Sequence, residues 1–394
     1  MRWLIWAGVL VMLLASPVWA KSNAGVIQTS TAPHSDTQVY TLDIGGDTTE
    51  LTFAYAVNLS DGIVTIRILD PQGKVLASHG GRVFTVGPGI IKDISGPGRY
   101  QVEVVSDKAV GRWQASVAPL LPRRFFPFHV AGSIAMLFVA LASVAWWRLR
   151  FGGGWRWVWA GAAMWVVGVA LKFAWAAITI NATLKWMESR LSRDMYVLLG
   201  GVYTGLLTGV FEIGVVAAAA LIWRRLASDA SRAVAIGVGA GAFEAALLGA
   251  AAAGSGVVVL LNVPQARESV APVMSLMLAT TPLAWLVGPV ERAITIPCHV
   301  SSRVLALLGV ARGKWTPFWI GFAMITLVDV VAGVAHVSGR LGMFSIWWLE
   351  LAILPFAILS LPLTVWAARK WPLTNAGRAP DCPAQLLLVG PSNP

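Results

Sequence analysis

The stretch at residues 128–147, FHVAGSIAMLFVALASVAWW, decides the fold class of this chain. It contains no Lys, Arg, Asp or Glu, and it has the length that an α-helix needs to cross the apolar layer of a bilayer. Arg148 and Arg150 follow it directly, which is typical of the point where a helix leaves the membrane. The stretch therefore predicts a transmembrane helix.

Further apolar stretches of similar length follow along the chain. Residues 264–282 hold three prolines and a moderately apolar middle, so we interpret them as an interfacial or re-entrant segment, with an eighth span as the alternative. We predict an α-helical polytopic membrane domain of about seven transmembrane helices. The predicted spans are 128–147, 158–180, 196–223, 233–261, 283–310, 318–336 and 344–368.

The composition of the whole chain agrees with this class. Hydrophobic residues make up 57% of the 394 residues and charged residues only 12%, with mean hydropathy +0.69 and twenty Trp. A soluble domain carries about twice that share of charge, so a purely cytosolic enzyme and a nucleic-acid module are excluded. The lipid bilayer is the expected partner, and the net charge of +11 fits basic residues that collect at one membrane face.

The distribution of basic residues predicts the orientation. One set of loops is rich in Arg and Lys, and the opposite set is poorer, which places the rich set in the cytoplasm. We therefore expect a bacterial inner-membrane protein with its N-terminal domain outside and its C-terminus in the cytoplasm. The rich set holds Arg148, Arg150, Arg156, Arg224, Arg225, Arg232, Arg312, Lys314, Arg369 and Lys370, and the poorer set holds Lys185, Arg190, Arg193, Arg267 and Arg340.

The N-terminus has the pattern of a signal peptide. Arg2 precedes an apolar core at 4–14, and the small residues Val18 and Ala20 stand before Lys21 as in a cleavage site. We predict a signal peptide at 1–20, and the alternative is an uncleaved anchor helix. In either case the segment that follows is exported.

Residues 21–122 show the pattern of an all-β domain. Polar and apolar residues alternate at 65–69 (TIRIL) and 100–105 (YQVEVV), and Gly- and Pro-rich turns separate such stretches. We expect about eight short strands in an exported β-sandwich of jelly-roll type, with His34 and His79 as ordinary surface histidines. The polytopic domain then covers 123–370 and a cytoplasmic tail covers 371–394.

The most informative residues are the ionisable groups inside the predicted spans. Each costs several kilocalories per mole at mid-bilayer, so each needs a partner or a function. Glu291 and His299 lie about two turns apart on one helix face, with Arg303 a further turn along. The acids and His299 on neighbouring spans predict one buried polar site, whereas Glu350, near the outer half of its span, is expected to be structural. The ionisable groups inside the predicted spans are Lys172, Glu212, Glu244, Glu291, Arg292, His299, Arg303, Asp329 and Glu350.

The order of four motifs between 158 and 337 resembles a known family. These are GVFE at 209–212, GVGAGAFEA at 237–245, Glu291-Arg292 followed by His299 and Ser302, and Asp329. The chain resembles the YhfC-type family of glutamic intramembrane proteases, which is related to the CAAX-protease and PrsW-like superfamily. The resemblance implies hydrolysis of a peptide bond in a membrane or exported protein, with no cofactor and no metal.

The resemblance also implies roles for particular residues. Glu212 and Glu244 would activate a water, and His299 would help to bind the oxyanion, so these three are the predicted catalytic residues. The predicted supporting polar residues are Glu291, Arg292, Asp329 and Lys172.

Several positions depart from the family's pattern, and they put catalysis in question. The family usually has paired acids at its first motif, but here Ile213 follows Glu212, and Val216 stands where an arginine would be expected. Ala240 and Ile325 replace family histidines. The chain is either an active peptidase with a rearranged site or a catalytically degenerate form that still binds peptides.

Other chemistries have weaker support in the sequence. Cys298 beside His299 would point about 100° away from it on a helix, which disfavours a thiol nucleophile. A metal site of Glu244, Glu291 and His299 is conceivable. The competing functional classes are a non-enzymatic client-binding or envelope-assembly protein, and a proton-coupled transporter.

Overall fold

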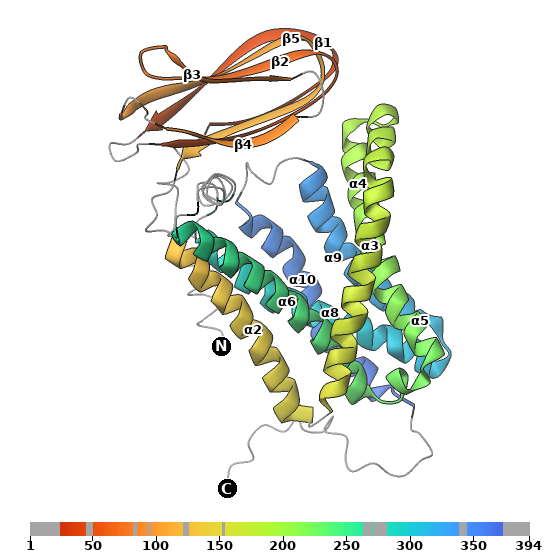
Figure 1. Ribbon diagram of the computed structural model, residues 1–394. Helices are drawn as coiled ribbons and strands as arrows, with labels where there is room; N and C mark the ends of the chain where they lie inside the picture. Colours follow the sequence, from red (N-terminus) through yellow and green to blue (C-terminus); the bar gives the residue numbers. More distant parts are fainter. Residues whose placement is uncertain are drawn as a thin grey trace. The chain divides into compact units, whose positions relative to one another are not determined.

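The computed structural model describes residues 24–372 apart from 45–49, 82–84, 93, 95, 121–125, 152–153, 262, 264–269, 271–280, 282 and 339–344. The predicted signal peptide at 1–20, most of 264–282 and most of the tail at 371–394 lie outside the described residues. The chain forms two compact units, one that holds the β-strands and one that holds most of the helices (Figure 1). The domain boundary at residue 122 stays a prediction.

The β unit is one antiparallel sheet. Its strands are β1 (Ala24–Ile44), β2 (Leu51–Leu69), β3 (Val75–Gly81), β4 (Thr85–Ile91) and β5 (Gly98–Pro119). They follow the order β1-β5-β2-β3. Strands β3 and β4 lie along the same edge of β2: β3 pairs with its C-terminal end at 64–69, and β4 pairs with its N-terminal end at 51–57.

Alternation of side chains explains how this sheet forms a core. The two stretches that predicted strands pair with each other, since Ile66 lies opposite Val104 and Ile68 opposite Val102. These four side chains are buried, while Arg67 on the other face donates to Glu103 across the strands at 3.1 Å. The period of two therefore separates a buried face from a solvated face.

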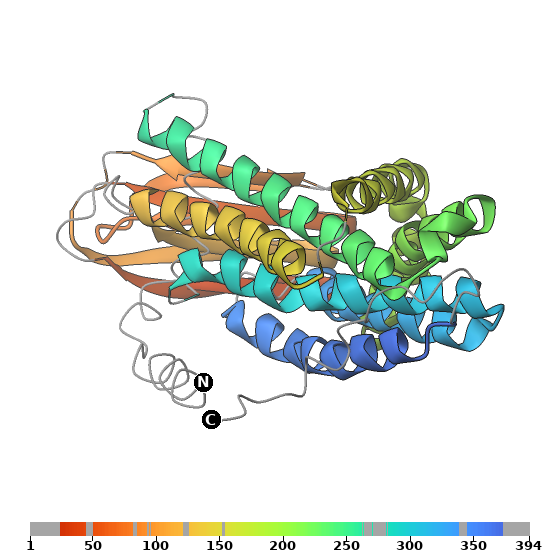
Figure 2. The same ribbon diagram turned by 90° about the horizontal axis from the view of Figure 1, so that it is seen from below.

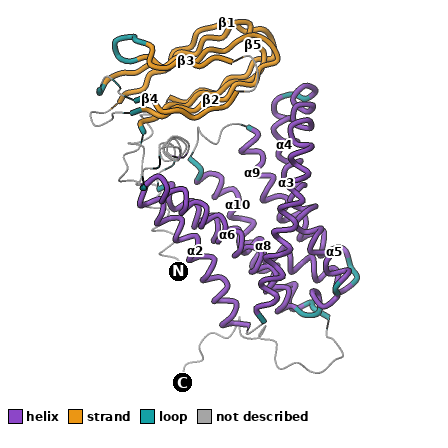
Figure 3. The backbone as a smooth tube through the Cα atoms, viewed as in Figure 1, coloured by secondary structure: helices purple, strands orange, loops and turns teal. Residues whose placement is uncertain are grey.

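The expected number of about eight short strands is wrong, because the described residues form five. Three of these are long and bend at irregularities in the ladder, near His34 in β1 and near Gly62 in β2 (Figure 3). Gly62 has φ +78°, which suits a bulge that continues the strand after a bend. The turn-like residues Gly87-Pro88-Gly89 also lie inside β4 and do not end a strand.

His79 is partly exposed, and its ring packs against two aromatic side chains of β2. Its ring lies 4.6 Å from the ring of Phe53 and 4.9 Å from that of Tyr55, measured between centroids. Desolvation by this packing lowers the pKa of the His79 imidazole.

The second unit contains the apolar helices. Seven helical segments in the described part of the chain are long and apolar enough to span a membrane, so the predicted seven spans and the polytopic fold class are confirmed. They are α2 (Phe126–Phe151), α3 (Trp155–Arg190), α4 (Arg193–Thr208) continued through the π-helical turn η3 (Gly209–Ile213) and α5 (Gly214–Ile222), α6 (Ala230–Leu260), α8 (Val287–Arg312) with the short η5 (Ala284–Leu286) before it, α9 (Trp315–Val337) and α10 (Trp347–Arg369).

Helix α8 is the central helix of the bundle. Of its most apolar window 89% is buried, whereas the corresponding value for the other spans is 50% or less. Figure 2 shows α8 in cyan between α6 in green and α10 in blue. Because α8 is enclosed, the charged side chains on it face protein and not lipid, and they must find partners on neighbouring helices.

Candidate functional site

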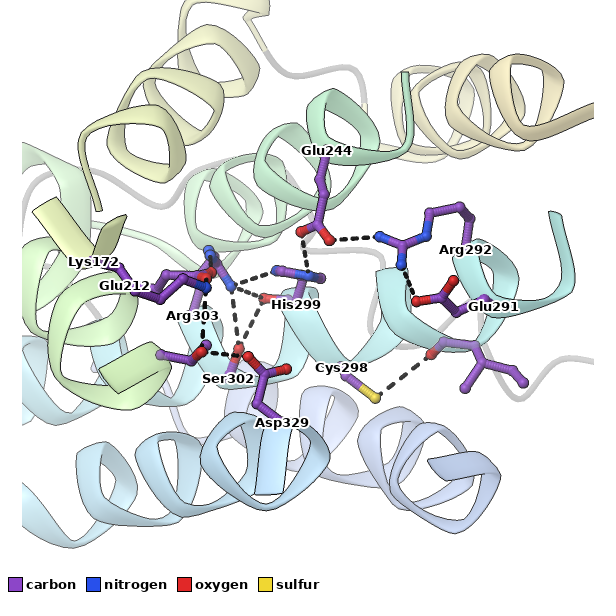
Figure 4. Close-up of polar contacts among 12 residues, drawn as sticks. Lys172, Glu212, Glu244, Glu291, Arg292, Cys298, His299, Ser302, Arg303 and Asp329 are labelled. Atoms are coloured by element: carbon purple, nitrogen blue, oxygen red, sulfur yellow. Dashed lines mark hydrogen bonds and ion pairs between the residues drawn. The ribbon is translucent and has the colours of Figure 1, made fainter. Parts of the chain in front are cut away.

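The ionisable groups predicted to form one site come from five helical segments. Lys172 lies on α3, Glu212 on the π-helical turn η3, Glu244 on α6 and Asp329 on α9. The central helix α8 supplies Glu291, Arg292, His299 and Arg303. Figure 4 shows these side chains pointing toward one another between the helices.

Glu212 is positioned by an unusual piece of backbone. Residues 209–213 form a π-helical turn between α4 and α5, a widened turn that is rare and frequent at functional sites. A Cβ atom added to Gly168 of α3 would lie 2.8 Å from the carbonyl oxygen of Phe211. The bare glycine thus lets α3 approach the turn that carries the carboxylate.

Glycines also let α6 approach α8. A Cβ atom on Gly237 would lie 2.5 Å from the Cα atom of Val300, and one on Gly241 would lie 3.2 Å from the Cβ atom of His299. Small residues therefore bring the helix that carries Glu244 against the helix that carries the imidazole.

The first half of the site is centred on Glu212, and we call Glu212, Lys172 and Arg303 the Glu212 cluster. Lys172 Nζ donates to Glu212 Oε1 at 3.0 Å, and Arg303 Nη2 donates to Glu212 Oε2 at 3.0 Å. The side chains of Arg303 and Glu212 are 1% and 3% exposed. This is a fully buried ion pair with a second cation on the same carboxylate.

The second half is centred on Glu244, and we call Glu244, Arg292, His299 and Glu291 the Glu244 cluster. Arg292 Nη1 donates to Glu244 Oε1 at 2.5 Å, and His299 Nε2 lies 2.9 Å from Glu244 Oε2. Arg292 also pairs with Glu291. Glu244 and Glu291 are 18% and 37% exposed, so this half is more open than the Glu212 cluster.

The two halves meet at His299, whose protonation follows from its partners. Arg303 Nη1 lies 2.9 Å from His299 Nδ1. A guanidinium can only donate, so Nδ1 must accept, and the ring proton is then on Nε2 and is donated to Glu244. His299 is therefore a neutral imidazole that links the two clusters.

Asp329 is connected through a threonine that the sequence analysis did not identify. Lys172 Nζ donates to Thr208 Oγ1 at 3.3 Å, and Thr208 donates in turn to Asp329. The sequence does not indicate that a threonine in an apolar helix links two charged side chains. All seven predicted site residues are thus parts of one hydrogen-bonded network, although their catalytic roles stay a prediction.

Arg303 has a larger part than the sequence suggested. Its helical spacing indicated a pairing with Glu291 or His299, and it does contact His299. Its other partner is Glu212, which lies 91 positions away in the chain. Only packing of α8 against η3 reveals that this guanidinium stands between a predicted catalytic acid and the predicted catalytic imidazole.

Two further groups in the spans lie apart from the hydrogen bonds of the network. Glu350 of α10 is buried, and its Oε2 atom has no hydrogen-bond partner among the described residues. Cys298 Sγ donates to the carbonyl oxygen of Ile294 at 3.5 Å, so it forms no dyad with His299 in this structure.

The substituted motif positions are filled by packing. Ile213, Val216 and Ile325 belong to the buried core of the bundle, and Ala240 is buried too. The apolar side chains that replace the family's polar groups are therefore part of the hydrophobic packing around the network.

The same side chains do not form a metal site. The described residues contain no group of three or more His, Cys, Asp and Glu side chains that could hold a metal ion. The conceivable trio of Glu244, Glu291 and His299 does not converge, because Arg292 stands between the two glutamates.

The helical unit is similar to a known family of membrane proteins. The model of the family described as YhfC intramembrane metalloprotease matches residues 135–362, which confirms the resemblance and extends it beyond 158–337. No curated protein matches the chain. Among solved structures, the enzymatically active domain of tailspike protein 4 from bacteriophage CBA120 matches at 16% identity over 25% of this chain and 19% of that chain, with a TM-score of 0.16. The chain spans about a fifth of that structure, and so low a score supports no statement about fold or function.

Proposed function

Because the chain belongs to the YhfC intramembrane metalloprotease family, we propose that this membrane protein binds a segment of a membrane or exported protein in its helical bundle without cleaving it. The observation that carries the proposal is the position of Arg303. Its guanidinium is buried between Glu212 and His299 and donates to both.

Hydrolysis by a glutamate needs a water next to a carboxylate oxygen that can take its proton. Both oxygens of Glu212 accept from cations, namely Lys172 and Arg303. The oxygens of Glu244 accept from Arg292 and His299. Every carboxylate oxygen of the two predicted acids therefore already accepts a hydrogen bond from a donor of the protein itself, and three of these four donors are cations.

The substituted motif positions support the same proposal. An oxyanion needs donors that are free to turn toward it, and His299 Nε2 is already committed to Glu244. Val216, Ala240 and Ile325 supply no polar group in its place. The family's scaffold is present, and the groups that would complete the reaction are replaced or paired.

The exposure of the network indicates how a bound segment would meet it. Exposure rises from 1% at Arg303 through 18% at Glu244 to 37% at Glu291. A helix or strand of a client protein would meet Glu291 and Glu244 first, and these carboxylates can accept hydrogen bonds from its backbone or side chains.

The test compares proteolysis with binding in native membranes. We expect the N-termini of membrane and exported proteins to be the same in cells that produce the wild-type chain, Glu244→Gln or no protein, as measured by mass spectrometry of membrane fractions. A photoreactive residue at Leu247, one turn from Glu244, should crosslink to a recurrent partner, whereas one at the exposed Leu149 of α2 should not. New N-termini that appear only with the wild-type chain would show that it is a peptidase.

The orientation predicted from charge belongs to the same proposal. We propose a bacterial inner-membrane location, with the β-domain on the periplasmic side and the C-terminus in the cytoplasm. The seven candidate spans among the described residues support this, because an odd number of crossings puts the two ends of the domain on opposite sides. Arg148 and Arg150 near the end of α2, and Arg312 at the end of α8, lie where the positive-inside rule requires.

The two cysteines allow a direct test of this topology. Cys298 is buried, so a membrane-impermeant maleimide should react only with Cys382 of the tail. We expect no labelling of Cys382 in intact spheroplasts and full labelling after the membrane is permeabilised, measured by the mass of the purified chain. Cys382→Ser is the control, and labelling in intact spheroplasts would reverse the proposed orientation.

A further inference from the structure

The family description implies a metal ion, and the side chains of this network can be compared with what such an ion needs. A catalytic zinc takes three protein ligands from His, Cys, Asp or Glu and keeps a fourth position open for water. Each ligand must turn a free lone pair toward a common point. In the network that joins the two clusters, the only imidazole among the described residues is that of His299.

The lone pair of His299 that could bind a metal is already taken. Its Nδ1 atom accepts from Arg303, and its Nε2 atom carries the proton that goes to Glu244. A metal ion at Nδ1 would have to occupy the volume of the Arg303 guanidinium. That guanidinium is 1% exposed, so the surrounding packing leaves it little room to move away.

The cations of the chain already pair with most of the carboxylates. The network has three fixed cations (Lys172, Arg292 and Arg303) and four carboxylates (Glu212, Glu244, Glu291 and Asp329); the cations contact the three glutamates, and Asp329 is joined through Thr208. A divalent ion beside Arg303 would add two positive charges where Glu212 already faces two cations. Repulsion between charges is strong in a buried site of low effective dielectric constant, so the residues present do not fit the metal.

We infer that Arg303 occupies the place between Glu212 and His299 that a metal ion would take in this site, and that the chain's own cations, in place of a metal, pair with the glutamates of the site. This inference does not rest on the proposed absence of hydrolysis, since an internal guanidinium could also serve an active glutamic peptidase. The inference concerns which cations pair with the carboxylates of the site.

The first experiment measures metal on the wild-type chain. The protein is produced in zinc-supplemented medium, purified in detergent without chelators and analysed for metal by mass spectrometry, and its melting is followed by Trp fluorescence with and without 1,10-phenanthroline. We expect far less than one metal ion per chain and no shift in melting temperature with the chelator. One bound ion per chain, lost together with stability on chelation and absent from His299→Ala, would overturn the inference.

The second experiment removes the guanidinium. Arg303→Ala leaves Glu212 and the Nδ1 atom of His299 facing a vacated position, and we expect it to bind Co²⁺ with visible d–d absorption that the wild-type chain lacks. The double variant Arg303→Ala/His299→Ala should lose this absorption. A folded Arg303→Ala protein without cobalt absorption would contradict the inference that Arg303 occupies the position of a metal ion. The wild-type measurement uses no substitution, so it decides the inference if the variant does not fold.

Discussion

Replacing Arg303 with methionine should lower the free energy of unfolding of the helical unit by about 3–5 kcal/mol, the usual cost of removing one partner of a buried ion pair. The loss is large because Glu212 and the Nδ1 atom of His299 would both lose a buried donor, and neither is near solvent. Methionine keeps much of the volume, so the effect reports on charge and hydrogen bonding. Denaturant titration in detergent micelles, followed by Trp fluorescence, measures it.

Arg369→Met provides the matched control. Arg369 is exposed at the end of α10, where a cation interacts only with the helix dipole, so its removal should cost less than about 1 kcal/mol. The double variant Arg303→Met/Glu212→Gln should recover part of the loss, because it no longer contains an unpaired buried carboxylate. Strictly additive losses in the double variant would mean that the two side chains are not coupled.

Replacing Glu212 with glutamine should have the second large effect, again about 3 kcal/mol or more in the free energy of unfolding. The substitution keeps the shape of the side chain and removes the one charge that both Lys172 and Arg303 contact. Two cations would then face a neutral amide inside the bundle. The same denaturant titration measures the change, and the circular-dichroism spectrum checks that the helices are retained.

Glu291→Gln is the control for this substitution. Glu291 is 37% exposed and has Arg292 as its charged partner, so its neutralisation should cost less than about 1 kcal/mol. Equal effects of the two substitutions would contradict the division of the network into a buried Glu212 cluster and a more open Glu244 cluster.

The candidate site shows where sequence reasoning succeeds in a membrane protein. A charge within an apolar span is so unfavourable that its presence alone indicates a function or a partner. This reasoning selected Lys172, Glu212 and Glu244 before any helix was placed against another. It could not select Thr208, because a hydroxyl in an apolar helix can bond to its own backbone and needs no distant partner.

The partners of these charges could not be predicted, since pairing depends on how the helices pack. Spacing on α8 indicated that Arg303 lies near His299, because both are on one helix. The spacing on α8 does not predict that the π-helical turn η3 brings Glu212 to the other side of the guanidinium. A widened turn of this kind has no clear sequence signal.

The β unit shows the same division. Alternation correctly predicted the strands around Ile66 and Val102, because a period of two follows from the geometry of any strand. The number of strands was wrong in part because Gly87-Pro88-Gly89 looks like a turn in sequence. In the folded sheet these residues lie inside β4 and pair with Tyr55, Ala54 and Phe53 of β2.

The sequence by itself determined that this chain is a polytopic membrane protein with an all-β unit, because burial in lipid and the pleat of a strand act on each segment separately. It also determined which side chains are out of place in an apolar helix. The tertiary structure alone decided that Arg303 lies between Glu212 and His299, because charges from distant parts of the chain find their partners only when the helices pack. That arrangement turns a set of predicted catalytic groups into a closed network of ion pairs.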